Sequence, residues 1–105
     1  MGTNLIDQYS LLHFATGIIA YFWGLNFYQW FYIHLLFELI ENTNIGMYII
    51  NKYFKDIWPG GKPKSDSFIN SIGDTIFSIL GWFLAYYIDY IGAKYKLYNK
   101  HIKTK

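Results

Sequence analysis

Apolar residues dominate two long stretches of the chain, and polar residues interrupt them at a few defined points. The first stretch runs over residues 9–50. It is too long for one membrane crossing, because a hydrocarbon core of about 30 Å needs only about 20 helical residues. A Gly and an Asn at residues 24–26 predict a turn that divides this stretch in two. The second stretch follows a Pro- and Gly-rich loop and begins after residues 65–67, where two Ser and an Asp are candidate helix N-caps.

This pattern predicts an all-α fold, a membrane bundle of about three transmembrane helices with an interfacial segment after the second. The expected elements are helices at residues 9–25, 27–43 and 68–90 and the interfacial segment at 45–58. Residues 1–93 are expected to form a single transmembrane helical domain, and residues 94–105 a basic tail that extends into water. We therefore expect an integral, multi-pass membrane protein.

Composition supports the membrane interpretation. Apolar residues make up 53% of the chain and charged residues 15%, against roughly 25% charged in an average soluble domain. The absence of Cys excludes disulfide scaffolds and thiolate metal sites. Because the net charge is only +2 and the Lys residues lie outside the apolar stretches, we expect no nucleic-acid partner. The tail carries more Lys than the loop at 52–64, so the positive-inside rule places the C-terminal tail in the cytoplasm.

Ionisable residues inside the predicted spans are costly, and they mark functional sites by default. Counted along three antiparallel helices, His13, Glu38, Asn70 and Asp74 fall at one depth, roughly 5–10 Å below one membrane face. His34, Glu38 and Glu41 share a helix face at positions i, i+4 and i+7. The candidate site residues are His13, His34, Glu38, Glu41, Asn70 and Asp74.

Small residues form stripes along the first and third predicted helices. Gly17 belongs to the first stripe, and Ser78 and Gly81 belong to the second. Small side chains let helices approach closely. If the two stripes face each other, the bundle is closely packed in one leaflet and polar in the other.

Three short segments carry a family resemblance. They are His13-Phe14 with Gly17, residues 34–42 (HLLFELIEN), and residues 66–74 (DSFINSIGD) followed by Gly81. Their order resembles the VanZ-like/YjdF-like group of small multi-pass membrane proteins, over about residues 7–87. The resemblance implies a multi-pass helical fold and an association with glycopeptide-antibiotic resistance known for some members, and it supports the site more than any one reaction.

Two function classes fit these residues. The first is a membrane-embedded enzyme that acts on a lipid or lipid-linked head group. A divalent metal ion would then be held by His34, Glu38 and Asp74, with water as the nucleophile. His13 would be the general base and Asn70 an orienting donor, and metal-free acid–base catalysis by the same residues stays open.

The alternative is a non-catalytic small membrane protein: an accessory subunit, an oligomeric assembly, or a proton- or cation-conducting pore. The polar residues would then hold helices together or line the ion path. Membrane lipids are the expected partners in both classes, and a homo-oligomer is open in the second. The sequence does not decide whether the protein is an enzyme.

Overall fold

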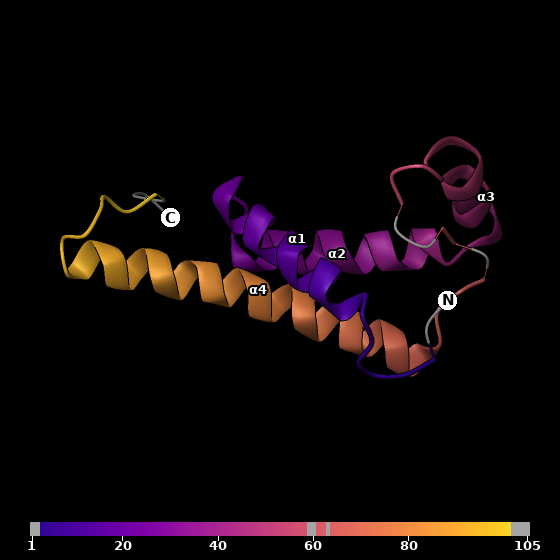
Figure 1. Ribbon diagram of the computed structural model, residues 1–105, viewed down its shortest axis with the longest axis horizontal. Helices are drawn as coiled ribbons and strands as arrows, with labels where there is room; N and C mark the ends of the chain where they lie inside the picture. The colour runs from indigo at the N-terminus through magenta and orange to yellow at the C-terminus, as the bar shows by residue number, and fades with distance from the viewer. Residues whose placement is uncertain (1–2, 59–60, 63, 102–105) are drawn as a thin grey trace.

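The structure is a computed structural model that describes residues 3–58, 61–62 and 64–101, and these residues contain four helices and no strand. The helices are α1 (Ser10–Phe22), α2 (Phe27–Glu41), α3 (Asn44–Tyr53) and α4 (Phe68–Lys94). Figure 1 shows α4 as the long base of the molecule, with α1 and α2 beside it and α3 near the end at which α4 begins. The all-α prediction is confirmed.

Local hydrogen bonds explain where the helices begin. Gly24 lies in the turn between α1 and α2 and has a φ of 87°, which a Gly adopts without strain. Asn26 and Gln29 then form a capping box, in which each side chain accepts a hydrogen bond from the other's backbone N–H, at 2.8 and 3.0 Å. At α4, the Ser67 hydroxyl accepts from the backbone N–H of Asn70 at 3.1 Å. The predicted turn at 24–26 and the predicted cap of the third helix are therefore confirmed.

Glycines bring α1 and α4 together. A side chain at Gly17 would collide with the backbone carbonyl of Ser78, and one at Gly81 would collide with the carbonyl of Phe14. The two predicted stripes thus face each other, as expected. This close contact fixes the register of α1 on α4, and it determines which side chains of α1 meet those of α4 at the polar end.

Only part of the predicted membrane topology is supported. Among the described residues, α4 is the helix that is long and apolar enough to cross a membrane, with 27 residues. Helices α1 and α2 have 13 and 15 residues, fewer than the about 20 that a perpendicular crossing needs. Crossings by these two helices, and with them the three-span bundle, are not confirmed.

The segment after α4 differs from its prediction. We expected residues 94–105 to extend into water, but residues 95–101 fold back along the end of α4 (Figure 1). The backbone N–H of His101 donates to Asp89 Oδ1 at 2.8 Å, and its Nε2–H donates to the Phe22 carbonyl at 2.8 Å. Tyr21 also donates to Asp89, so this buried carboxylate collects donors from both ends of the chain. Residues 102–105 lie outside the described residues.

Candidate metal centre

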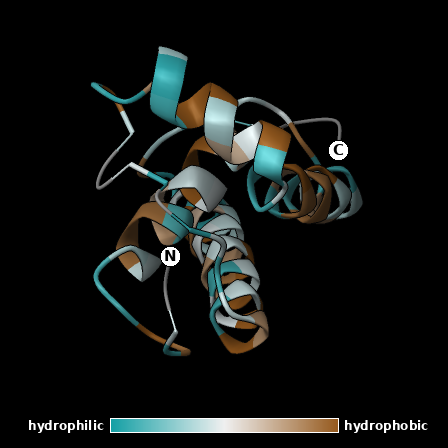
Figure 2. Ribbon diagram, turned by 90° about the vertical axis from the view of Figure 1, so that its right-hand side faces the viewer, coloured by the Kyte–Doolittle hydropathy of each residue, from teal (hydrophilic) through white to brown (hydrophobic). Residues whose placement is uncertain are grey.

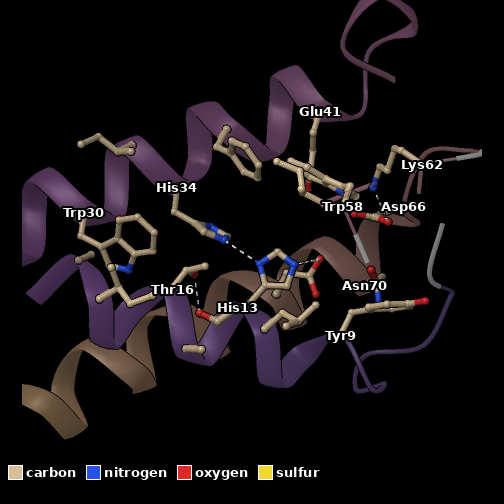
Figure 3. A pocket seen from close by; sticks show the side chains of 18 of the residues that line it. Tyr9, His13, Thr16, Trp30, His34, Glu41, Trp58, Lys62, Asp66 and Asn70 are labelled. Atoms are coloured by element: carbon tan, nitrogen blue, oxygen red, sulfur yellow. Dashed lines mark hydrogen bonds and ion pairs between the residues drawn. The ribbon is translucent and has the colours of Figure 1, made fainter. Parts of the chain in front are cut away.

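Three helices contribute to one polar cluster at the end of the molecule near α3. We define the cluster as His13 from α1, His34 and Glu38 from α2, and Asp74 from α4. In Figure 3 the side chains of His13 and His34 point toward each other across the space between α1 and α2. Apart from His13, which is partly exposed, these side chains are buried.

Three potential ligand atoms of the cluster form a compact triangle. His13 Nδ1 lies 3.2 Å from His34 Nε2 and 3.8 Å from Glu38 Oε1, and His34 Nε2 lies 3.9 Å from Glu38 Oε1. The point equidistant from the three atoms is about 2.1 Å from each, which equals the usual length of a zinc–nitrogen or zinc–oxygen bond. The three atoms are therefore close enough together for one metal ion to contact all of them.

Outer contacts of the two imidazoles determine where their lone pairs point. His13 Nε2 lies 3.2 Å from Asp74 Oδ2, within ion-pair distance when the ring is protonated. His34 Nδ1 lies 3.5 Å from the Thr75 hydroxyl, which itself donates to the Ser71 carbonyl at 3.0 Å and can accept from the imidazole. When both outer nitrogens carry the ring protons, the inner nitrogens present lone pairs to the centre of the triangle, whereas in the other tautomer of either ring one inner nitrogen donates to the other across 3.2 Å.

The third atom of the triangle is an unsatisfied acceptor. Glu38 Oε1 is buried and has no hydrogen-bond partner among the described residues, whereas Glu38 Oε2 accepts from the Asn42 side chain at 3.3 Å. A buried carboxylate oxygen without a donor is costly. The two facing nitrogens can share one proton with each other, whereas Glu38 Oε1 keeps no donor among the described residues. A cation bound by all three atoms would satisfy them together.

The structure groups the predicted ligands differently from the sequence. His34, Glu38 and Asp74 were the expected set, but Asp74 lies on the outer side of His13, while His13 Nδ1 joins His34 and Glu38. A second group joins Glu38 and Asp74 with Asp66. His/Glu/Asp groups close enough to hold a metal ion are thus present, with His13 as a potential ligand rather than the expected free base.

The two other predicted site residues lie nearby in different roles. Glu41 is buried one turn beyond Glu38 on α2, outside both groups of potential ligands, and it lines a cavity that His13 and His34 also line. The Asn70 side chain donates to the Asn4 carbonyl at 2.7 Å and to Asp7 Oδ2 at 3.0 Å. Asn70 thus attaches the segment before α1 to α4, and this contact holds His13 at the depth of Asp74.

One residue beside the cluster was not expected from the sequence. Lys62, which belongs to the predicted Pro- and Gly-rich loop, is buried and forms an ion pair with Asp66 at 2.8 Å. Two hydrogen bonds to the Asn51 side chain, at 2.7 and 2.8 Å, hold the Lys62 backbone in place. The spacing of four residues between Lys62 and Asp66 was the available signal. Lys62 lines the same cavity as the two histidines.

Comparison of the chain with models of protein families, with characterised proteins and with solved structures gives no match. The resemblance to the VanZ-like/YjdF-like group therefore stays a prediction. Function has to be argued from the cluster and its surroundings.

Proposed function

We propose that the protein is a membrane-embedded enzyme in which His13, His34 and Glu38 bind one divalent metal ion, and that this ion activates water against the head group of a lipid or lipid-linked molecule. The observation that carries the proposal is the convergence of three potential ligand atoms, of which Glu38 Oε1 has no hydrogen-bond partner among the described residues. Two imidazole nitrogens and one carboxylate oxygen suit zinc or another borderline ion, whereas magnesium and calcium prefer oxygen ligands alone.

The second group of potential ligands, the carboxylates of Glu38, Asp66 and Asp74, is a weaker candidate for a metal site than the histidine triangle. Asp66 already pairs with Lys62 at 2.8 Å, so an ion there would have to compete with a buried ammonium group. Among the described residues, no ammonium group forms an ion pair with an atom of the histidine triangle. Asp74 and Thr75 also stand where outer partners of metal-bound histidines stand in known sites, fixing the ring orientation and the tautomer.

The ligand count favours catalysis over a purely structural ion. Structural zinc sites have four protein ligands, whereas catalytic sites have three and keep one position for water or substrate. His13 and His34 both line a cavity of about 660 Å³, into which the open position would face. A divalent ion held by His13, His34 and Glu38 would make a bound water lose a proton near neutral pH and would so supply a hydroxide for the hydrolysis of an ester. In that hydrolysis the oxygen of the water would bond to the ester centre, the bond to the alcohol oxygen would break, and the alcohol oxygen would take up the proton that the water lost.

The distribution of polar and apolar side chains supports a lipid environment. Figure 2 shows hydrophobic residues along the helices. Many large apolar residues are exposed, while the buried set is rich in polar residues such as Ser10, His34 and Asp74. Soluble proteins show the reverse, and exposed apolar surface of this extent indicates contact with membrane or protein. Asp74 lies six residues after Phe68, about 9 Å along α4, so the cluster would lie near the head groups if α4 crosses the bilayer.

Metal analysis of purified protein tests the proposal. Protein in detergent is incubated with zinc, freed of excess ion, and assayed for zinc per chain and for head-group release from phospholipid vesicles. We expect one zinc per chain in the wild type. Glu38→Gln should lower the affinity by more than the about 10–100-fold that loss of an outer contact costs, with the helical fold retained.

Asp56→Asn is the matched control, because Asp56 is an exposed carboxylate outside the cluster. Equal zinc content in the wild type and in Glu38→Gln contradicts the proposed metal centre. Folded wild type without zinc, whose Glu38→Gln variant loses only its oligomeric state, supports the non-catalytic alternative instead.

A further inference from the structure

The cavity beside the cluster extends well beyond it. Helices α1 and α2 pack on α4 more closely than on each other, and the space left between them holds about 660 Å³. This volume is within the range of small-molecule sites. The cavity is polar at the His13 end, where Lys62 and Asp66 also line it, and apolar along the rest of α1 and α2.

Apolar side chains along the cavity lack the cover that they would have in a core. Ile19 of α1 and Ile33 of α2 are each 46% exposed, and Phe37 is 42% exposed, although all three line the cavity. Water in such a space makes few hydrogen bonds, so an apolar occupant is favoured. An occupant of the whole cavity must therefore be polar at one end and apolar along its length.

The length of the cavity fits a hydrocarbon chain. The lining residues extend from His13 in α1 to Trp23, the residue that follows α1. Ten helical steps separate these two positions, which corresponds to about 15 Å. Trp30 lies at the far end in Figure 3, where its indole N–H donates to the Ser78 carbonyl at 3.2 Å. That contact holds the ring in place as one boundary of the apolar portion.

We infer that this cavity holds one alkyl chain of a lipid whose head group reaches His13, His34 and Lys62, which line the polar end of the cavity. The identity of the head-group site rests on the proposed function, and the alkyl site rests on the cavity itself. The continuity of apolar and polar linings places both ends of one amphiphile in the same space. The substrate is then a lipid held by its tail inside the protein, and its tail length contributes to selection.

Photo-crosslinking tests the occupant. The protein is reconstituted in vesicles of phosphatidylcholine and phosphatidylglycerol that contain a phospholipid with a diazirine midway along one acyl chain. After irradiation, the labelled residues are mapped by peptide sequencing. We expect labelling at Ile19, Ile33 and Phe37 to exceed labelling at Leu11 and Leu36, which are exposed but lie outside the cavity lining. Even labelling of all exposed apolar residues would overturn the inference, since it indicates surrounding bilayer lipid only.

Filling the cavity provides the second arm. Ile19→Trp should lower labelling of Ile33 to the level of Leu36, because the larger ring fills the space that the chain would occupy beside Ile33. Leu11→Trp also introduces a Trp into α1, but at an exposed position outside the cavity, and it should leave the labelling of Ile33 unchanged. Ile33→Trp with Leu36→Trp as its control repeats the comparison on α2 if Ile19→Trp does not fold. Unchanged labelling of Ile33 in a folded Ile19→Trp protein overturns the inference.

The same experiment separates this inference from the proposed function. Glu38→Gln protein, which should bind zinc poorly, is labelled alongside the wild type. Selective cavity labelling in wild-type protein that binds no zinc supports the alkyl site and contradicts only the metal centre. Zinc binding with even labelling contradicts only the alkyl site.

Discussion

His13 Nε2 lies 3.2 Å from Asp74 Oδ2, so a residue of α4 orients an imidazole of α1. This contact turns the other nitrogen of His13 toward His34 and Glu38. A carboxylate behind a histidine ligand raises the basicity of the ligand and fixes its tautomer. The contact therefore links the packing of α1 on α4 directly to the chemistry of the cluster.

Removal of this carboxylate should weaken metal binding without removing a ligand. We expect Asp74→Ala to lower zinc affinity about 10–100-fold, the usual cost of losing an outer partner, while one zinc per chain still binds at saturation. Asp74→Asn retains a neutral acceptor and should fall between Asp74→Ala and the wild type. Zinc titration with a competing indicator measures both. If Asp74→Ala binds zinc as tightly as the wild type, the orienting role is wrong.

Zinc binding should weaken in acid. Each histidine must be deprotonated to bind the ion, so protons compete with the ion for both imidazoles. Affinity should therefore fall as the imidazoles gain protons, by up to about 100-fold per pH unit if two protons are displaced by one ion. Because burial disfavours the charged form of both rings, the fall should begin below the range in which exposed histidines titrate. Titrations between about pH 4 and 7.5 test this dependence, and affinity that is constant through this whole range would contradict histidine ligation.

The contact at the opposite end of the molecule should contribute to stability independently of the metal. Tyr21 donates to Asp89, which also accepts from the backbone of His101. Tyr21→Phe removes one donor from a buried carboxylate and should destabilise the protein by about 1–3 kcal/mol, measured by thermal unfolding in detergent. Tyr87→Phe, at an exposed tyrosine of α4, is the control and should change stability little. Equal melting temperatures for the two variants would contradict a stabilising contact between Tyr21 and Asp89.

The fold was largely predictable where local chemistry decides it. The Gly24–Asn26 turn, the Ser67 cap and the small-residue contact of Gly17 with α4 follow from side-chain size and hydrogen-bonding capacity within a few positions. The return of His101 to Asp89 was missed because a basic, polar segment carries no local signal for a contact twelve residues away. Hydropathy also predicted longer spans at α1 and α2 than the structure shows.

The position of the cluster was predictable, but its internal order was not. Helix periodicity and depth counting predicted that His13, Glu38 and Asp74 would meet, and the structure brings them together. The pattern could not tell which nitrogen of His13 faces which carboxylate, because that depends on the rotation of α1 about its axis and on the side-chain rotamer. Lys62 lies in a loop whose path no periodicity describes.

X-ray absorption at the zinc edge tests most directly whether one ion binds between two imidazoles and one carboxylate. For zinc-loaded protein we expect a shell of nitrogen and oxygen donors at about 2.0–2.2 Å. We also expect outer scattering from two imidazole rings, which diminishes in His34→Ala. A spectrum with oxygen donors alone and no imidazole scattering, or one that is unchanged in folded His34→Ala, would contradict it.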